Sequence, residues 1–153
     1  VVPVAREVEY AKGYLTIQKM RYKDKLEFEI DVEPSILNIP LIKLVLQPII
    51  ENAIYHGLKY KESKGLLQVK GFMKDGNAVL QVIDNGVGMD EETLAHIYDK
   101  HKVNYHSNGV GVYNVQKRLK LYYGENYGIT YESEKGVGTT ATITIPGIQE
   151  ESI

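Results

Sequence analysis

Two pairs of alternating segments, each joined by a tight turn, constrain the fold of this chain more than any other feature. Residues 66–73 and 78–84 both alternate apolar and polar side chains, with an Asp-Gly dipeptide between them. Asp-Gly in that setting is a strong signal for a β-hairpin. Residues 127–133 and 139–146 repeat the arrangement around a glycine-containing turn. The sequence therefore predicts two hairpins.

Helical and extended patterns precede the first hairpin. Residues 4–22 carry apolar side chains at helical spacing, and residues 25–32 alternate as a half-buried strand does. We then expect a helix that is capped by Asn38, runs to about Gly57 and is kinked at Pro48.

Two more helices are predicted between the hairpins. One begins at Asp90 and ends near Lys100, and the other buries a face that includes Tyr122 and stops at Gly124. Paired antiparallel strands grouped between helices indicate an α+β fold, a two-layer α/β sandwich, rather than a parallel βαβ sheet.

Composition narrows the possible functions. The chain has 153 residues, a net charge of −2 and no cysteine. The charge gives no electrostatic reason to expect nucleic acid or an anionic membrane as a partner. The absence of cysteine excludes disulfides, thiolate catalysis and cysteine-ligated zinc. Polar residues interrupt the most apolar stretch, residues 36–50, so we expect no membrane span.

A group of polar residues lies beside the apolar run that ends at Gly57. Asn52 and His56 are one helical turn apart, with Glu51 and Tyr55 further round the helix. A solvated helix face is the plain interpretation for any one of them. A short amide beside bulky aliphatic residues is more consistent with partial burial, and a buried amide needs a partner such as a ligand or a metal.

Two glycine motifs follow. Asp84 ends a predicted strand, and Gly86 and Gly88 come directly after it. This pattern suits close approach of backbone to a flat ligand, with the carboxylate accepting from an exocyclic amine, although a glycine-rich turn would look the same. Residues 107–115 place a glycine pair before a helix, where N–H groups can converge on an anion or simply allow a sharp entry.

The second motif matches neither familiar phosphate-binding fingerprint. It lacks the third glycine and the parallel βαβ unit of dinucleotide-binding folds, and no Gly-Lys-Ser/Thr follows it. A further Gly-x-Gly-Thr-Thr stretch opens the last strand. There Thr139 can offer a hydroxyl to a ligand, whereas Thr140 is interpreted as a strand former.

Taken in order, these motifs resemble the ATP-binding domain of sensor histidine kinases, in the superfamily shared with gyrase, the ninety-kilodalton chaperone and mismatch-repair ATPases. The segments "LQPIIENAIYHG" and "NGVGVYNVQKRLKLYYG" are most similar to the LytS/YesM-like branch. The resemblance implies a Bergerat-type fold with a mixed, mostly antiparallel sheet covered by helices on one face. It also implies that residues 1–24 are a helical linker from absent phosphoacceptor helices and residues 25–153 the kinase domain.

The resemblance implies specific roles at the site. Asn52 would coordinate Mg²⁺, Glu51 would polarise the attacking imidazole or only orient its surroundings, and Asp84 would bind the adenine amine. Residues 99–108 would form a lid over ATP. The expected catalytic residues are Glu51 and Asn52, and the expected nucleotide contacts are Asn52, Tyr55, His56, Lys59, Asp84, Gly86, Gly88, Met89, Asn108, Gly109, Val110, Gly111 and Thr139.

This chain departs from the family pattern at functionally important positions. Tyr55 replaces a frequent Lys or Arg, which leaves Lys59 or Lys102 as candidate phosphate contacts. Pro48 stands where hydrolytic relatives carry a general-base Glu, which favours a kinase over an ATPase switch. The phosphoacceptor motif of the branch is missing, so we expect a catalytic fragment that does not autophosphorylate.

Three other functions stay open at this stage: a gyrase- or chaperone-type nucleotide switch, an anti-sigma-type serine kinase, and a module that kept the fold but lost nucleotide affinity. The favoured interpretation implies ATP and Mg²⁺ as ligands and a histidine on the phosphoacceptor helix of the same or a partner protomer as acceptor. It also implies a response regulator downstream, no contact of this fragment with nucleic acid or membrane, and a cytoplasmic location within a membrane-anchored protein.

Overall fold

The computed structural model describes residues 1–58, 62–97 and 111–149. Its centre is a five-stranded sheet with strand order β2-β4-β5-β7-β6. The strands are β2 (Leu26–Val32), β4 (Gly65–Lys74), β5 (Asn77–Asp84), β6 (Gly128–Glu134) and β7 (Gly138–Pro146). β2 pairs with β4 in parallel and all other neighbours are antiparallel, which confirms the mixed, mostly antiparallel sheet.

Both predicted hairpins are present. β4 and β5 pair up to Lys74 and Asn77, and the two residues between them have positive φ, 52° at Asp75 and 81° at Gly76. Two left-handed central residues define the type I′ turn, whose twist matches that of the strands it joins. The second hairpin joins β6 to β7.

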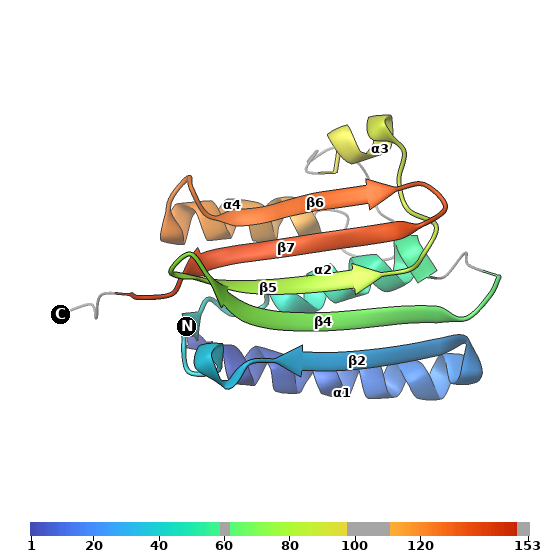
Figure 1. Ribbon diagram of the computed structural model, residues 1–153, viewed down its shortest axis with the longest axis horizontal. Coiled ribbons are helices and arrows are strands. Elements are labelled where there is room, and N and C mark those ends of the chain that lie inside the picture. The colour runs from blue at the N-terminus through green and yellow to red at the C-terminus, as the bar shows by residue number, and fades with distance from the viewer. Residues whose placement is uncertain (59–61, 98–110, 150–153) are drawn as a thin grey trace.

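Helices cover one face of the sheet (Figure 1). This layer contains α1 (Val4–Tyr22), α2 (Leu46–Asn52) with its π-helical continuation η3 (Ala53–Leu58), and α4 (Gly111–Tyr123). Apolar side chains of both layers meet at their interface, which excludes water and supplies the main stabilising term. The fully buried ones include Leu15, Leu46, Ile50, Leu67, Leu119 and Ile143.

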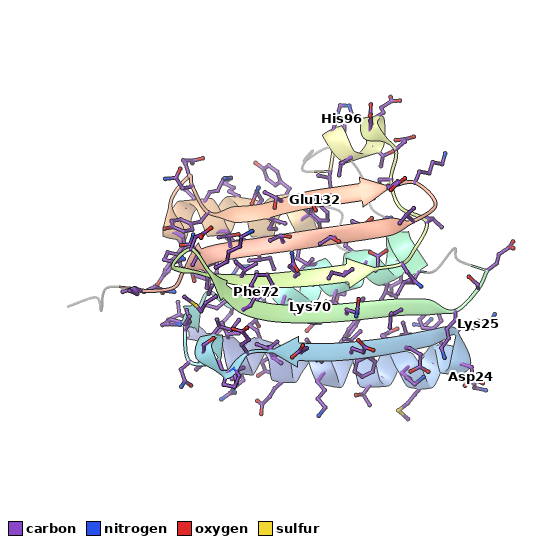
Figure 2. The ribbon with its side chains drawn as sticks, viewed as in Figure 1. Asp24, Lys25, Lys70, Phe72, His96 and Glu132 are labelled. Atoms are coloured by element: carbon purple, nitrogen blue, oxygen red, sulfur yellow. The ribbon has the colours of Figure 1, made fainter. Side chains whose placement is uncertain are left out.

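On the opposite face of the sheet, no helix of residues 1–58, 62–97 or 111–149 covers the strands (Figure 1). Figure 2 shows Lys70, Phe72 and Glu132 on this face. A depression of about 500 Å³ lies there, and the strand register aligns Gln68, Ile83 and Thr140 along its floor. Asp84 borders this depression at the end of β5, while its carboxylate lies on the helix-covered side of the sheet, close to Gly57.

The predicted helix from Asn38 to Gly57 is wrong over its first half. Residues 34–36 form a short 3-10 turn, η2 (Pro34–Ile36), and β3 (Pro40–Leu41) pairs with β1 (Val2–Pro3). The helix begins only at Leu46, so Pro48 lies in its first turn and introduces no kink.

Contacts from distant parts of the chain explain the late start. The Glu7 carboxylate accepts hydrogen bonds from the backbone N–H groups of Val45, at 2.8 Å, and Leu46, at 3.3 Å. The Arg118 guanidinium donates to the carbonyls of Lys43 and Leu44. These partners satisfy backbone groups that a longer helix would have used.

Two smaller predictions also need correction. The helix that begins at Asp90 is α3 (Glu91–Ala95), which ends well before residue 100, although Asp90 caps it as expected by accepting from the Thr93 N–H at 2.7 Å. In α4 the inward residue is Tyr123 rather than Tyr122, which is 58% exposed. The Tyr123 hydroxyl accepts from the Ile42 N–H.

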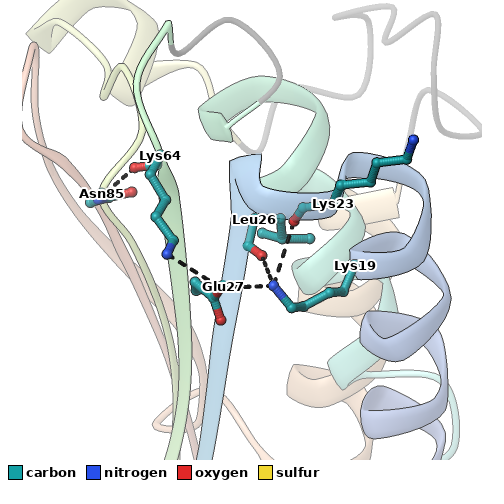
Figure 3. A network of polar contacts seen from close by, with 6 residues as sticks. All are labelled: Lys19, Lys23, Leu26, Glu27, Lys64 and Asn85. Carbon is teal, nitrogen blue, oxygen red and sulfur yellow. Dashed lines mark hydrogen bonds and ion pairs between the residues drawn. The ribbon is translucent and has the colours of Figure 1, made fainter.

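A polar network ties α1 to the sheet and to the loop after β5 (Figure 3). Lys19 Nζ donates to Glu27 Oε1 at 2.7 Å, and Lys64 Nζ lies 3.3 Å from the same oxygen. The Asn85 amide donates to the Lys64 carbonyl at 3.4 Å.

In the described part of the chain, no helix is both long and apolar enough to cross a membrane.

Candidate functional site

Asp84 is the buried acid at the centre of the candidate site. It ends β5 and is 6% exposed. Burial raises its pKa from 3.8 to about 6, while the backbone N–H groups of Gly86 and Thr139 act in the opposite direction. Gly86 donates to Asp84 Oδ1 at 2.9 Å. The carboxylate is therefore held by backbone donors, which leaves acceptor capacity for a ligand.

Gly57 and Gly86 allow the helical layer to approach Asp84 very closely. A Cβ on Gly57 would lie 2.7 Å from Asp84 Oδ1, and a Cβ on Gly86 would lie 2.3 Å from the Gly57 carbonyl carbon. The Val87 N–H donates to the Gly57 carbonyl at 3.0 Å. The glycine at 86 is thus required by the packing of the loop against η3.

Gly88 and Met89 are held against the β6–β7 turn. Gly88 has φ +70°, and a Cβ there would lie 2.0 Å from the Glu134 carbonyl oxygen. The Met89 N–H donates to the Ser133 hydroxyl at 2.8 Å. These contacts fix the course of the loop that runs away from Asp84.

Thr139 lies beside Asp84 in the register of β5 and β7. Its hydroxyl is 2.7 Å from the Ser133 hydroxyl, which also donates to the Gly138 carbonyl at 3.0 Å. Ser133 was not among the predicted site residues, although it joins Thr139 to Met89. Its place beside Thr139 depends on the pairing of β6 with β7.

Asn85 is another residue that the motif did not single out. Its Oδ1 accepts from the Leu66 N–H at 2.7 Å, and its own N–H donates to the Leu66 carbonyl at 3.2 Å. Asn85 therefore extends the attachment of the loop to β4. Its role is to anchor the loop that follows Asp84.

The helical half of the site lies at the end of α2 and in η3. Asn52 ends α2 and is half-buried, as are Glu51 and Tyr55, whereas His56 is exposed. The Gln47 amide donates to Glu51 Oε1 at 3.1 Å. A π-helical turn directly after Asn52 is notable because such turns are frequent at functional sites.

The start of α4 faces this helix. A Cβ on Gly111 would lie 3.8 Å from Pro48 Cβ, and Pro48 precedes Asn52 by one helical turn on the same face. The N-terminal end of α4, the positive end of its dipole, therefore lies beside Pro48, one turn from Asn52. An amide oxygen and a helix N-terminus suit a cation and the anion that it neutralises.

The structure brings together most of the predicted site but leaves part of it undescribed. Asp84, Gly86, Gly88, Met89 and Thr139 form one continuous region, which η3 joins to Asn52. Lys59, Lys102, Asn108, Gly109, Val110 and the predicted lid at 99–108 lie outside the described residues. Within the described ranges no three His, Asp or Glu side chains converge to hold a metal.

Known proteins resemble the chain in sequence. It is 32% identical over 146 residues to the sensor histidine kinase YesM of Bacillus subtilis, covering 95% of this chain and 24% of the relative. It is 34% identical over 128 residues to the sensor protein LytS of Oceanobacillus iheyensis, covering 82% and 22%. The chain thus spans about a quarter of the length of these relatives.

The fold has also been seen before. The catalytic domain of histidine kinase ThkA superposes with a TM-score of 0.69 at 16% identity, covering 94% of this chain and 90% of that one. A family model described as "Histidine kinase-, DNA gyrase B-, and HSP90-like ATPase" matches residues 38–149. The chain belongs to this ATPase family.

Proposed function

We propose that this chain is the ATP-binding catalytic domain of a sensor histidine kinase, which transfers the γ-phosphoryl group of ATP to a histidine on a phosphoacceptor domain. The observation that carries the proposal is the placement of Asp84. A buried acceptor held by backbone donors lies against η3 at Gly57. Asn52 comes about one and a half turns before Gly57, and the start of α4 lies beside Pro48, one turn earlier again. The names of the relatives support the same function.

In this proposal the loop after β5 binds the base. Above its pKa of about 6 the Asp84 carboxylate accepts from the exocyclic amine of adenine. The backbone at Gly86, Gly88 and Met89 lines the base pocket, and Thr139 borders it. The close packing of this loop against Gly57 and Glu134 would keep the pocket preformed, so that little conformational entropy is lost on binding.

The helical side would hold the metal and the phosphates. Mg²⁺ keeps several waters and takes few protein ligands, so the single amide oxygen of Asn52 fits its chemistry. When bound, the ion would neutralise charge on the triphosphate. The α4 N-terminus at Gly111 would face the phosphates, and Tyr55 and His56 would flank them from η3.

Additional phosphate contacts are proposed from Lys59 and from Asn108 to Val110. Phosphoryl transfer depends mainly on positioning and on charge neutralisation. The acceptor imidazole would approach from the Glu51 side of α2, where this carboxylate would orient or polarise it.

Pro48 favours transfer to a protein acceptor over hydrolysis. It occupies the first turn of α2, one turn before Asn52, and its side chain faces Gly111. A proline carries no general base at the position from which water would be activated in the hydrolytic relatives. The proposed partners are therefore a phosphoacceptor helix and, downstream, a response regulator, within a longer membrane-anchored protein.

Calorimetric titration with ADP, with and without Mg²⁺, tests the nucleotide site. We expect saturable, Mg²⁺-dependent binding that Asp84→Asn weakens at least about tenfold, since a hydrogen bond to a charged group contributes about 1.5–3 kcal/mol. Asp31→Asn, on exposed β2 surface, is the matched control and should bind normally. Equal affinity of all three proteins, or no binding by any, would count against the proposal.

A further inference from the structure

A row of paired side chains crosses the sheet on its helix-covered side. The strand register places Leu67, Asp84, Thr139 and Ser133 opposite one another on β4, β5, β7 and β6. Directly paired residues point to the same face, and their Cβ atoms lie about 4.5–5.5 Å apart. Because the Asp84 carboxylate lies close to Gly57, on the side of the helices, the hydroxyls of Thr139 and Ser133 lie on that side as well. The row therefore continues the candidate site from its buried acid to the edge strand β6.

The Ser133 hydroxyl uses its full hydrogen-bonding capacity. It accepts from the Met89 N–H at 2.8 Å, donates to the Gly138 carbonyl at 3.0 Å and lies 2.7 Å from the Thr139 hydroxyl. A serine hydroxyl has one proton and two acceptor lone pairs. A carbonyl can only accept, so the Ser133 proton is used at Gly138. Thr139 is therefore the donor in the contact between the two hydroxyls.

The polarity of the Thr139 side chain follows from this count. Its one proton points to Ser133, so toward the neighbouring Asp84 its oxygen offers lone pairs only. The ionised Asp84 carboxylate is an acceptor as well. Two adjacent acceptors suit a ligand edge that carries an amino group. A carbonyl oxygen at the same place would leave all of these acceptors without a donor, which is unfavourable.

We propose that Ser133 is a positioning residue for base selection, which holds the Thr139 proton away from the base and so favours a 6-amino purine over a 6-oxo purine. This inference rests on the proposed nucleotide-binding function, in which Asp84 and Thr139 meet the base. Ser133 does not touch the base in this scheme, and it acts through the Thr139 hydroxyl. Without Ser133 Oγ, Thr139 could turn its proton toward the base, and the site would discriminate less between the two purines.

Calorimetric titration with ADP and with inosine diphosphate, both in the presence of Mg²⁺, measures this selection. The two ligands differ in the amino or oxo group at position 6 of the purine and in the N1 proton that accompanies the oxo group. The unmodified chain should bind ADP at least about a hundredfold more tightly than inosine diphosphate. Ser133→Ala should lower this ratio about tenfold, because a freed Thr139 proton can pair with the oxo group. Ser133→Thr keeps a hydroxyl and should keep the ratio.

Two further variants separate hydroxyl polarity from packing. Thr139→Val removes one of the two acceptors and should lower the ratio by itself, which keeps the test decisive if Ser133→Ala does not fold. In the Thr139→Val background, Ser133→Ala should not change the ratio further. Thr130→Ala, at an exposed position of β6, is the matched control and should bind both nucleotides normally.

The outcomes separate this inference from the proposed function. If ADP binds but Ser133→Ala weakens both nucleotides equally, Ser133 only anchors the loop at Met89, and the inference is wrong. An unchanged ratio in Thr139→Val, or equal affinity of the unmodified chain for both nucleotides, also overturns it while the nucleotide site stands. If the unmodified chain binds neither nucleotide, the proposed function fails and the inference fails with it.

Discussion

At the scale of single residues, Asp84 couples binding to stability. Its carboxyl group is buried, and the hydrogen bonds that it accepts from the backbone do not lower its pKa back to the ordinary range of an aspartate. Burying an ionised group costs free energy, and here a ligand donor is the natural compensation. The residue proposed to select the base is therefore also a source of instability in the free protein.

The first prediction concerns the pH dependence of stability. Because the pKa of Asp84 is raised to about 6, the folded state binds more protons than the unfolded state between pH 4 and pH 6. Its contribution to the free energy of unfolding should therefore fall as pH rises through this range, by about 2 kcal/mol. Urea denaturation of the unmodified chain and Asp84→Asn at several pH values measures the difference, and a pH-independent difference would contradict it.

A second prediction compares two glycines. Gly86→Ala should destabilise the fold by about 2 kcal/mol or more and abolish ADP binding, because its Cβ would overlap the Gly57 backbone. Gly13→Ala, in open space on α1, should instead stabilise by about 1 kcal/mol. Thermal unfolding of both variants measures this difference. If both substitutions changed the melting temperature alike, the Gly57–Gly86 contact would not limit the size of residue 86.

At the scale of elements, α2 shows where sequence patterns stop being informative. The hairpins, α1 and the stop of α4 follow from local signals. These are one Asp-Gly turn, one glycine-containing turn, helical spacing, and Gly124, whose N–H donates to the Lys120 carbonyl. The start of α2 depends on Glu7, 38 residues earlier. Asn38 and Pro40 together imitate a helix start, and no local pattern reveals that Pro40 instead pairs with Pro3.

The third prediction tests that distant cap. Glu7→Ala removes the acceptor of two backbone N–H groups at the start of α2 and should lower the free energy of unfolding by about 2 kcal/mol. Glu7→Gln keeps an acceptor oxygen and should cost less. Glu9→Ala, on the exposed side of the same helix, is the control, and an equal effect at both positions would argue against the cap.

At the scale of the whole molecule, the fold class and the continuous loop region around Asp84 could be expected from the sequence. The contact of Gly57 with Gly86 could not, since it depends on η3 crossing the end of β5. Nor could the roles of Ser133 and Asn85, which depend on strand pairing. The sequence can predict residues that belong to a local motif. Residues that connect one motif to another can be identified only from the structure.

A fourth prediction concerns the network in Figure 3. Glu27 joins α1, β2 and the segment before β4, and Lys19 and then Lys64 lower its pKa. A lowered pKa stabilises the fold above the pKa of the unfolded state, and this contribution is lost as pH falls through the folded value. Because the Glu27 side chain is 42% exposed, Glu27→Gln should change the melting temperature only slightly, and less at high salt. A large, salt-independent loss would contradict this.

The contact between Gly57 and Gly86 has a practical consequence for inhibitors. The wall that it forms beside Asp84 consists of main chain, which side-chain substitution cannot reshape without disturbing the fold. A compound that competes for the proposed base pocket and draws its affinity from this wall would meet few viable resistance mutations there. Resistance would have to arise at neighbouring side chains that do not form this wall.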